Sequence, residues 1–305
     1  MRKIKVADYI FNKIQKEGVD FIPIYQSGNA LHLINAVGQN KKLNDFVNYH
    51  EQANGLAAEA YGRFKNLGVC CVGSGPAATN LSSAVMSAYC DSIPTLFVTG
   101  QVGMFHNKQK RKIRQRGFQE VDVTSHMKPI TKYSVLVTKL ENLRYELEKC
   151  IYLAKSGRPG PVVIDIPFNV QIAEINPNKL KKFIPPKKIN NTKKYEFISK
   201  ELISEIKKSR KPVIILGGGV QNLKNNDLVL KLLSKLNIPV TTTWAASDIL
   251  YHDFHLNLGN AGRSGNRSAI YAIQESDLLI SFGCRFTTKV VTNEKTFASK
   301  AKKIN

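Results

Sequence analysis

A glutamate at the start of a helix of small residues is the clearest chemical feature of this sequence. Glu51 follows a strand-like run at residues 46–49, and the helix that it opens is rich in small residues. Small side chains let another backbone or a planar ligand approach closely, so the acid is expected to be buried. A helix N-terminus favours the charged carboxylate whereas burial favours the neutral acid, which suits a group that shares a proton. Taken alone, Glu51 is better explained as an ordinary first-turn acid.

A second candidate is the turn Ser74-Gly75-Pro76-Ala77-Ala78-Thr79-Asn80, which joins a buried strand to a helix. Gly75 permits close backbone approach, Pro76 fixes the direction of the chain, and Asn80 can bond a ring or a neighbouring loop. The turn is not the GxGxxG pattern of dinucleotide-binding proteins.

Strands that alternate with helices must position these groups. The apolar runs at 68–73, 94–99 and 161–167 are nearly continuous, which is typical of parallel strands covered on both faces. The sequence therefore predicts an α/β fold with two doubly wound parallel-sheet domains. Helices are expected at 4–17, 31–37, 77–89, 140–154, 197–207, 228–236 and 268–274, and further strands at 21–25, 46–49, 212–216, 238–242 and 278–282.

The expected domain boundaries follow from composition. Residues 1–175 form the first domain, 176–195 a lysine-rich linker without acids, and 196–305 the second domain. A further helical segment is expected before residue 301, with a strand beyond the last residue, so the second domain is predicted to be truncated.

Composition limits the classes of function. The net charge is +22, from 45 basic and 23 acidic residues, but no nucleic-acid-binding motif accompanies it and it is interpreted as general bias. Neither a membrane-spanning run nor a signal peptide is recognised, so a cytoplasmic protein is expected. The five cysteines are expected to be reduced core thiols, and no metal site is assigned because His252 and His255 lack a third ligand.

Five ordered blocks within the first 170 residues carry a resemblance to a known family. They are His50-Glu51-Gln52; Ser74 to Asn80; Asp91-Ser92-Ile93-Pro94 running into Gly100-Gln101-Val102; Phe118-Gln119-Glu120 with Lys128-Pro129-Ile130-Thr131-Lys132; and Ser156 to Pro161 continuing through Asp165-Ile166-Pro167. This pattern resembles the thiamine-diphosphate-dependent enzymes of the acetolactate synthase type. The second half resembles the family's middle domain through Gly217-Gly218-Gly219, Thr243-Trp244 and Ser281 to Arg285.

The resemblance implies a pyrimidine-binding first domain and a role for each matched residue. Glu51 would activate thiamine diphosphate through its pyrimidine ring, and the turn with Gly75, Pro76 and Asn80 would lie against that ring. Gln119 would reach the same cavity and help to position the reacting group. The implied reaction is decarboxylation of a 2-oxo acid, with pyruvate as expected donor, and ligation to an acceptor carbonyl in branched-chain amino acid or polysaccharide biosynthesis.

Two departures and one basic cluster modify this implication. Ala77 stands where the family usually has glycine, and Ile24-Tyr25-Gln26-Ser27-Gly28 replaces the usual Tyr-Pro-Gly-Gly. The cluster Lys108 to Arg116 is more charged than in acetolactate synthases proper and looks more like a subgroup linked to surface polysaccharides. It either attracts an anionic acceptor such as a keto nucleotide sugar, or is simply a solvated or subunit-facing loop.

The resemblance also implies that FAD can bind in the middle domain. Arg158, Gly217, Gly218, Gly219, Gly283 and Arg285 are compatible with such a site. Capping glycines of a purely structural turn explain the same residues equally well.

The family's Gly-Asp-Gly motif, which holds Mg²⁺ and the diphosphate, does not occur in these 305 residues. The expectation is therefore a fragment or split subunit that works as a homodimer or tetramer, or with a separate chain carrying the diphosphate-binding domain. The alternative is a non-catalytic remnant that keeps the fold. A nucleic-acid-binding module is the third interpretation, and nothing beyond charge favours it.

Overall fold

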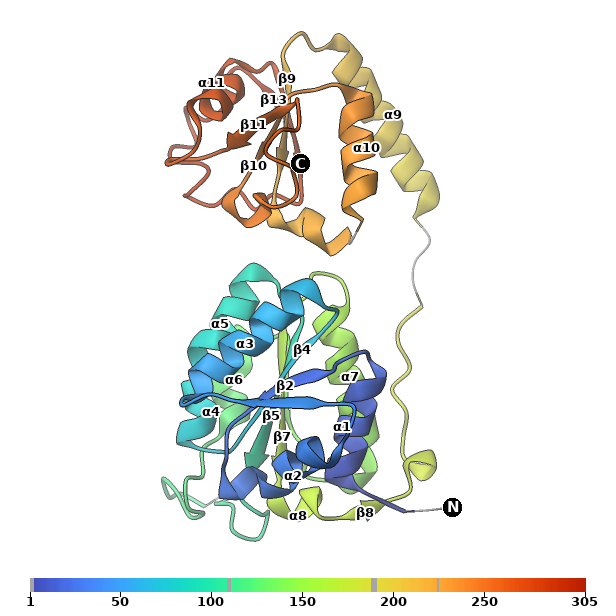
Figure 1. Ribbon diagram of the computed structural model, residues 1–305, viewed down its shortest axis with the longest axis vertical. Coiled ribbons are helices and arrows are strands. Elements are labelled where there is room, and N and C mark those ends of the chain that lie inside the picture. Colours follow the sequence, from blue (N-terminus) through green and yellow to red (C-terminus); the bar gives the residue numbers. More distant parts are fainter. Residues whose placement is uncertain (1–2, 109–110, 188–190, 224) are drawn as a thin grey trace. The chain divides into compact units, whose positions relative to one another are not determined.

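The computed structural model describes residues 3–108, 111–187, 191–223 and 225–305. The chain forms two compact units, unit 1 up to Lys187 and unit 2 from Lys188 onward. Each unit is an α/β structure with one parallel sheet, as the sequence predicted (Figure 1).

Unit 1 is built on a six-stranded sheet in the order β3-β2-β4-β5-β7-β6, and all its neighbouring strands are parallel. The chain moves outward from β2 to β3 and then returns to the other side of β2, so the strand order switches direction between β2 and β4. Ligands of open parallel sheets bind outside the carboxyl ends of the strands near such a switch. The strands are β2 (Phe21–Ile24), β3 (Asn44–Val47), β4 (Gly68–Val72), β5 (Thr95–Gln101), β6 (Tyr133–Leu136) and β7 (Pro161–Pro167); β1 (Ile4–Lys5) and β8 (Glu174–Ile175) form a separate antiparallel pair.

Helices cover both faces of this sheet (Figure 1). One layer packs α1 (Val6–Lys16), α2 (Leu31–Gln39) and α7 (Leu143–Lys155), and the other packs α3 (Glu51–Phe64), α4 (Pro76–Asn80), α5 (Ser82–Asp91) and α6 (Val123–Met127). The short helix α8 (Phe168–Gln171) follows β7. Because β4 alternates between the two faces, Cys70 lies in the α3–α5 layer and Cys71 lies in the α1–α7 layer.

Unit 2 repeats this design on a smaller scale. Its five parallel strands run in the order β11-β10-β9-β12-β13, and the direction switches between β9 and β12. Helices α9 and α10 pack on one face and α11 on the other (Figure 1). The elements are α9 (Thr192–Lys208), β9 (Pro212–Leu216), α10 (Asn226–Leu236), β10 (Val240–Thr242), β11 (Asn257–Asn260), α11 (Arg267–Glu275), β12 (Leu278–Phe282) and β13 (Lys302–Ile304).

The helix predicted before residue 301 is wrong. Residues 294–300 form turns, and they are followed by a strand within the chain, β13, which pairs with β12 through Leu278 and Lys302. Two other strands of the parallel sheets, β6 and β11, were not predicted, nor was the short antiparallel pair of β1 and β8. The strands β6, β11 and β13 are edge strands with few fully buried side chains, so they lack the continuous apolar run that marks the central strands.

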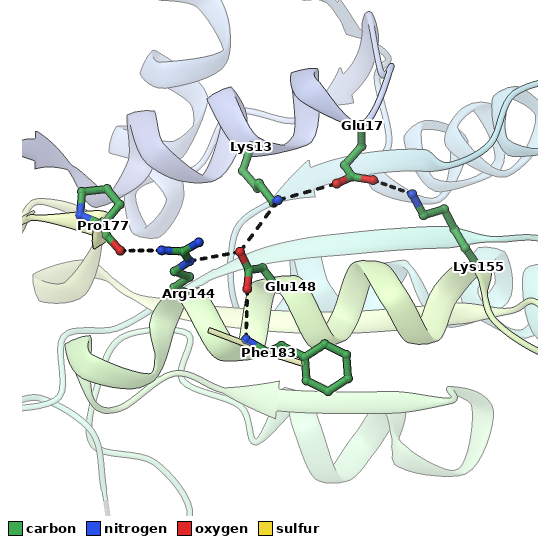
Figure 2. Close-up of polar contacts among 7 residues, drawn as sticks. All are labelled: Lys13, Glu17, Arg144, Glu148, Lys155, Pro177 and Phe183. Carbon is green, nitrogen blue, oxygen red and sulfur yellow. Dashed lines mark hydrogen bonds and ion pairs between the residues drawn. The ribbon is translucent and has the colours of Figure 1, made fainter. Parts of the chain in front are cut away.

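Hydrogen bonds and ion pairs of α7 side chains hold the first part of the predicted linker against unit 1 (Figure 2). Arg144 donates to the carbonyl oxygen of Pro177 at 2.8 Å and pairs with Glu148 at 3.0 Å, while Glu148 accepts the backbone N–H of Phe183 at 3.0 Å. Lys13 of α1 completes the group at 3.8 Å from Glu148. Residues 177–183 therefore contact α7, residues 192–195 belong to α9, and residues 188–190 of the predicted linker lie outside the described part of the chain.

Candidate active site

Three of the predicted site segments follow strands of the unit 1 sheet. Glu51 comes after β3, the Gly75 turn after β4, and Gln119 lies in the long connection that leaves β5. Since the carboxyl ends of parallel strands meet at one edge of the sheet, these segments lie together beside the switch between β2 and β4.

Glu51 is the first residue of α3 and is buried, with 8% of its surface exposed. Asn54, one turn further on, fixes this helix start: its amide donates to the carbonyl oxygen of Ile24 at 3.0 Å, and its oxygen accepts from the backbone and side chain of Asn48. His50 caps the helix by accepting the N–H of Gln52 at 3.2 Å. The acid is therefore held at a defined place at the edge of the sheet.

The carboxylate of Glu51 accepts a hydrogen bond from the amide of Asn80 at 2.9 Å. This contact joins two residues that the sequence predicted separately. Burial raises the pKa of the Cys70 thiol of β4 well above its usual range, and electrostatic repulsion from Cys71 and Glu51 acts in the same direction.

The small residues of α3 serve packing between elements of unit 1. A Cβ at Gly55 would lie less than 3.0 Å from side-chain atoms of Ala84 and Leu81, so this glycine allows α3 to lie directly against α5. Of the two roles expected for the small residues, the structure shows the close approach of another element.

Gly75 and Gln119 meet across the edge of the sheet. Gly75 has φ +60° and ψ −124°, and a Cβ there would lie less than 3.0 Å from the backbone of Gln119. Ser74 donates to the carbonyl oxygen of Gln119 at 3.0 Å, and Pro76 is the first residue of α4, where proline is well suited. Gln119 itself adopts a left-handed φ of +59° and its side chain is exposed.

Asn29 and Ser74 are site residues that the sequence analysis did not assign. The amide of Asn29 donates to the hydroxyl of Ser74 at 2.9 Å and to the carbonyl oxygen of Phe118 at 3.5 Å. Asn29 thereby connects the segment after β2 to both segments that contact Gln119. Asn29 directly follows Gln26-Ser27-Gly28, where the sequence differs from the family pattern, and this position could have indicated a site residue.

The arrangement fits the pyrimidine end of thiamine diphosphate. A buried carboxylate can hold a proton at a ring nitrogen, and the segments around it are tied together by side-chain hydrogen bonds rather than left open. Among the described residues no group of three His, Cys, Asp or Glu side chains could hold a metal ion.

The six residues proposed for FAD fall in both units. Arg158 belongs to unit 1, where its guanidinium donates to the hydroxyl of Ser92 at 2.7 Å, and the other five belong to unit 2. A Cβ at Gly217 or at Gly219 would lie less than 3.0 Å from the backbone of Gly283, and the N–H of Gly219 donates to the carbonyl oxygen of Gly283 at 3.0 Å. Packing of β9 against β12 accounts for these glycines without a flavin.

Comparison with known proteins identifies the domains of this chain. Residues 4–126 match the family described as thiamine pyrophosphate enzyme, N-terminal TPP binding domain, and residues 199–305 match the thiamine pyrophosphate enzyme, central domain. The chain belongs to the thiamine pyrophosphate enzymes and carries these two domains.

Within that family the chain is similar to acetolactate synthases. It is 35% identical over 309 residues to a probable acetolactate synthase large subunit of Methanocaldococcus jannaschii, covering 99% of this chain and 51% of the relative. It is 34% identical over 311 residues to the acetolactate synthase large subunit of Lactococcus lactis, covering 99% and 52%, and 33% identical over 301 residues to the chloroplastic acetolactate synthase of Arabidopsis thaliana, covering 98% and 44%. The chain thus spans about half the length of these relatives. Among the described residues no helix is both long and apolar enough to cross a membrane.

Proposed function

We propose that this chain supplies the cofactor-activating part of a thiamine-diphosphate-dependent 2-oxo acid decarboxylase and carboligase of the acetolactate synthase type. The observation that carries the proposal is the buried Glu51 carboxylate at the start of α3, with Asn80 donating to it at 2.9 Å. Pyruvate is the proposed donor. Mg²⁺ and the diphosphate are proposed to bind a Gly-Asp-Gly domain on another segment or subunit, in a homodimer, a tetramer or a complex of two chains.

Each site residue of this chain has a separate proposed role at the pyrimidine end of the cofactor. When bound, thiamine diphosphate supplies an aminopyrimidine whose 4′-nitrogen can accept the proton of the thiazolium carbon. Glu51 holds a proton at the ring nitrogen N1′, and Asn80 orients the carboxylate that does so. Gly75 and Pro76 shape the wall beside the ring, and the exposed amide of Gln119 is available to position the substrate.

The basic segment at residues 111–116 supports a proposal for the acceptor. Its residues are exposed, and among them Arg111, Lys112 and Arg114 carry positive charge next to Gln119 in the chain. We propose that these cations attract an anionic acceptor, either a second 2-oxo acid or the diphosphate of a keto nucleotide sugar. Gln109 and Lys110 of the predicted basic cluster lie outside the described residues.

The test of the donor reaction is CO₂ release from pyruvate by the chain produced together with a Gly-Asp-Gly diphosphate-binding domain, in the presence of thiamine diphosphate and Mg²⁺. Glu51→Gln is expected to lower the rate by about 100-fold or more, because a positioned acid or base contributes 10²–10⁴-fold. Glu141→Gln, at an exposed acid of the same unit, is the matched control. Equal rates in Glu51→Gln and in the control would overturn the proposed function.

The acceptor proposal is tested separately. Replacing Arg111 and Arg114 by glutamine is expected to raise the KM of the anionic acceptor by about tenfold, with CO₂ release unchanged, because only the attraction of the acceptor is weakened. An unaltered acceptor KM would show that the segment is merely solvated or faces another subunit.

A further inference from the structure

Glu120, the neighbour of Gln119, gathers backbone N–H groups from two parts of the connection after β5. One carboxylate oxygen accepts from Lys108 at 2.7 Å, and the other accepts from Arg116 at 3.1 Å and from Gly117 at 3.0 Å. The residue is buried, with 6% of its surface exposed. Burial acts to raise the pKa of Glu120, but the three backbone N–H groups and the charge of Lys108 outweigh burial and hold the pKa below its usual value.

These contacts give the basic segment its shape. Arg116 ends this segment, Gly117 follows it and Lys108 precedes it, so a single carboxylate binds the backbone on both sides of the segment. The side chain of Arg116 is held as well: it donates to the carbonyl oxygen of Phe105 at 2.5 Å, and its guanidinium lies 5.3 Å from the centre of the Phe105 ring. Arg111 and Arg114 remain exposed on a segment whose base is anchored.

In the chain Glu120 lies between two residues whose carbonyl oxygens are held by side chains, Gln119 and Val121. On one side Ser74 donates to the carbonyl oxygen of Gln119, and Gly75 lies against its backbone. On the other side the buried amide of Gln101 donates to the carbonyl oxygen of Val121 at 2.9 Å. A left-handed φ of +59° is unfavourable for a glutamine, so it persists only where the surrounding contacts enforce it.

We propose that Glu120 is a positioning residue that holds Gln119 and the basic segment as one unit beside the Gly75 turn. The inference rests on the proposed function for its effect on catalysis, but the structural part of it does not. A carboxylate is suited to this role because both of its oxygens accept hydrogen bonds, and an amide offers only one accepting oxygen. Glu120→Gln therefore leaves at least one of the three N–H groups facing a donor.

Hydrogen exchange in the full chain tests the structural part. In Glu120→Gln, peptides covering residues 111–120 are expected to exchange about tenfold faster than in the unsubstituted chain, which corresponds to the loss of one charge-assisted hydrogen bond. Peptides from α7 should not change, and Glu141→Gln should leave both regions unaltered. Glu120→Asp keeps the charge but retracts the carboxylate by one methylene, and should accelerate the same peptides to a smaller extent. Unchanged exchange in both Glu120 variants would overturn the proposal.

A double-mutant cycle tests the link to Gln119, in the assembly that carries the diphosphate-binding domain. If Glu120 acts through Gln119, Glu120→Gln should lower kcat for carboligation about tenfold, and adding it to Gln119→Ala should cause little further loss. Independent losses that multiply would show a role in stability alone and would overturn the proposal. Failure of the proposed function is distinguishable, because full activity in Glu51→Gln overturns that function and leaves the exchange result standing.

Discussion

At the carboxyl edges of the two sheets, different kinds of contact hold together the segments that follow the strands. In unit 1 side-chain hydrogen bonds of Asn29 and Ser74 join the segments after β2, β4 and β5, and Glu120 joins two parts of the connection after β5. In unit 2 the segments after β9 and β12 touch through the bare backbone of Gly217, Gly219 and Gly283. The difference teaches that a shared topology does not fix what lies at its switch point: side-chain hydrogen bonds join the segments in unit 1, whereas close backbone contact between glycines joins the segments after β9 and β12 in unit 2.

The largest effect is expected from disrupting the close backbone contact between the segments after β9 and β12. In Gly217→Ala the new Cβ would meet the backbone of Gly283 and Cys284, which cannot rotate away, so unit 2 should lose about 4 kcal/mol of unfolding free energy or fail to fold. Trp244, the single tryptophan, lies in unit 2, and its fluorescence in urea measures the loss.

Gly218→Ala is the matched control. There the nearest atoms are the Cβ of Ala245 at 3.0 Å and its carbonyl oxygen at 3.1 Å, which need to shift by only a few tenths of an ångström, so the expected loss is about 1 kcal/mol. Equal losses at Gly217 and Gly218 would contradict the steric account.

The unfolding free energy of unit 1 alone is expected to change with pH, by about 3 kcal/mol. Burial raises the pKa of Asp165 to about 7, although Gln101 and Thr99 donate to its carboxylate at 2.9 and 2.7 Å and oppose the shift. Between its ordinary pKa of 3.8 and this value, the folded chain keeps a proton that the unfolded chain has lost. The unfolding free energy therefore falls as pH rises, by roughly 3 kcal/mol from pH 5 to pH 8.

The measurement compares the unsubstituted chain with Asp165→Asn at both pH values. Hydrogen exchange of β5 and β7 peptides in urea, corrected for the intrinsic pH dependence of exchange, gives the stability of unit 1. Most of the decrease in unfolding free energy between pH 5 and pH 8 should disappear in Asp165→Asn. Trp244 fluorescence should show no such decrease for unit 2. A fall of the same size in Asp165→Asn would assign it to other groups.

A smaller effect is expected where unit 1 also relies on a glycine. Gly75→Ala combines a positive φ with a contact to the Gln119 backbone, and should cost about 2 kcal/mol. Faster hydrogen exchange in peptides covering 73–80 and 117–122 is the readout. Gly28→Ala, whose Cβ meets nothing within 4 Å and whose φ is not positive, should change exchange little. Similar effects of the two variants would refute the close contact at Gly75.

The smallest effect concerns the polar contacts on α7. Arg144→Gln removes the hydrogen bond to Pro177 and the pair with Glu148, so residues 177–183 should detach more often, by about 1 kcal/mol. Cleavage after Lys179, Lys181 and Lys182 by a lysine-specific protease should become about fivefold faster. Lys139→Gln, at an exposed position, is the control, and equal cleavage rates in the two variants would contradict the anchoring.

The sequence predicted the parts of this structure that depend on local pattern. The central strands were recognised because their apolar runs are buried on both faces, and Glu51 and the Gly75 turn were recognised from ordered motifs. The edge strands β6, β11 and β13 were missed because they lack such runs. Asn29, Ser74 and Glu120 were not assigned because their partners lie elsewhere in the chain, and only the strand order brings them together.

The two cysteines of β4 can report separately on the opening of the two helical layers of unit 1. Cys70 and Cys71 are adjacent in the chain but buried in opposite helical layers of unit 1, and burial raises the pKa of both thiols. A thiol reagent can therefore modify each one only when its own layer opens, while the exposed Cys90 reacts at once. The labelling rates at 70 and 71 would show whether the two layers separate from the sheet together or one after the other.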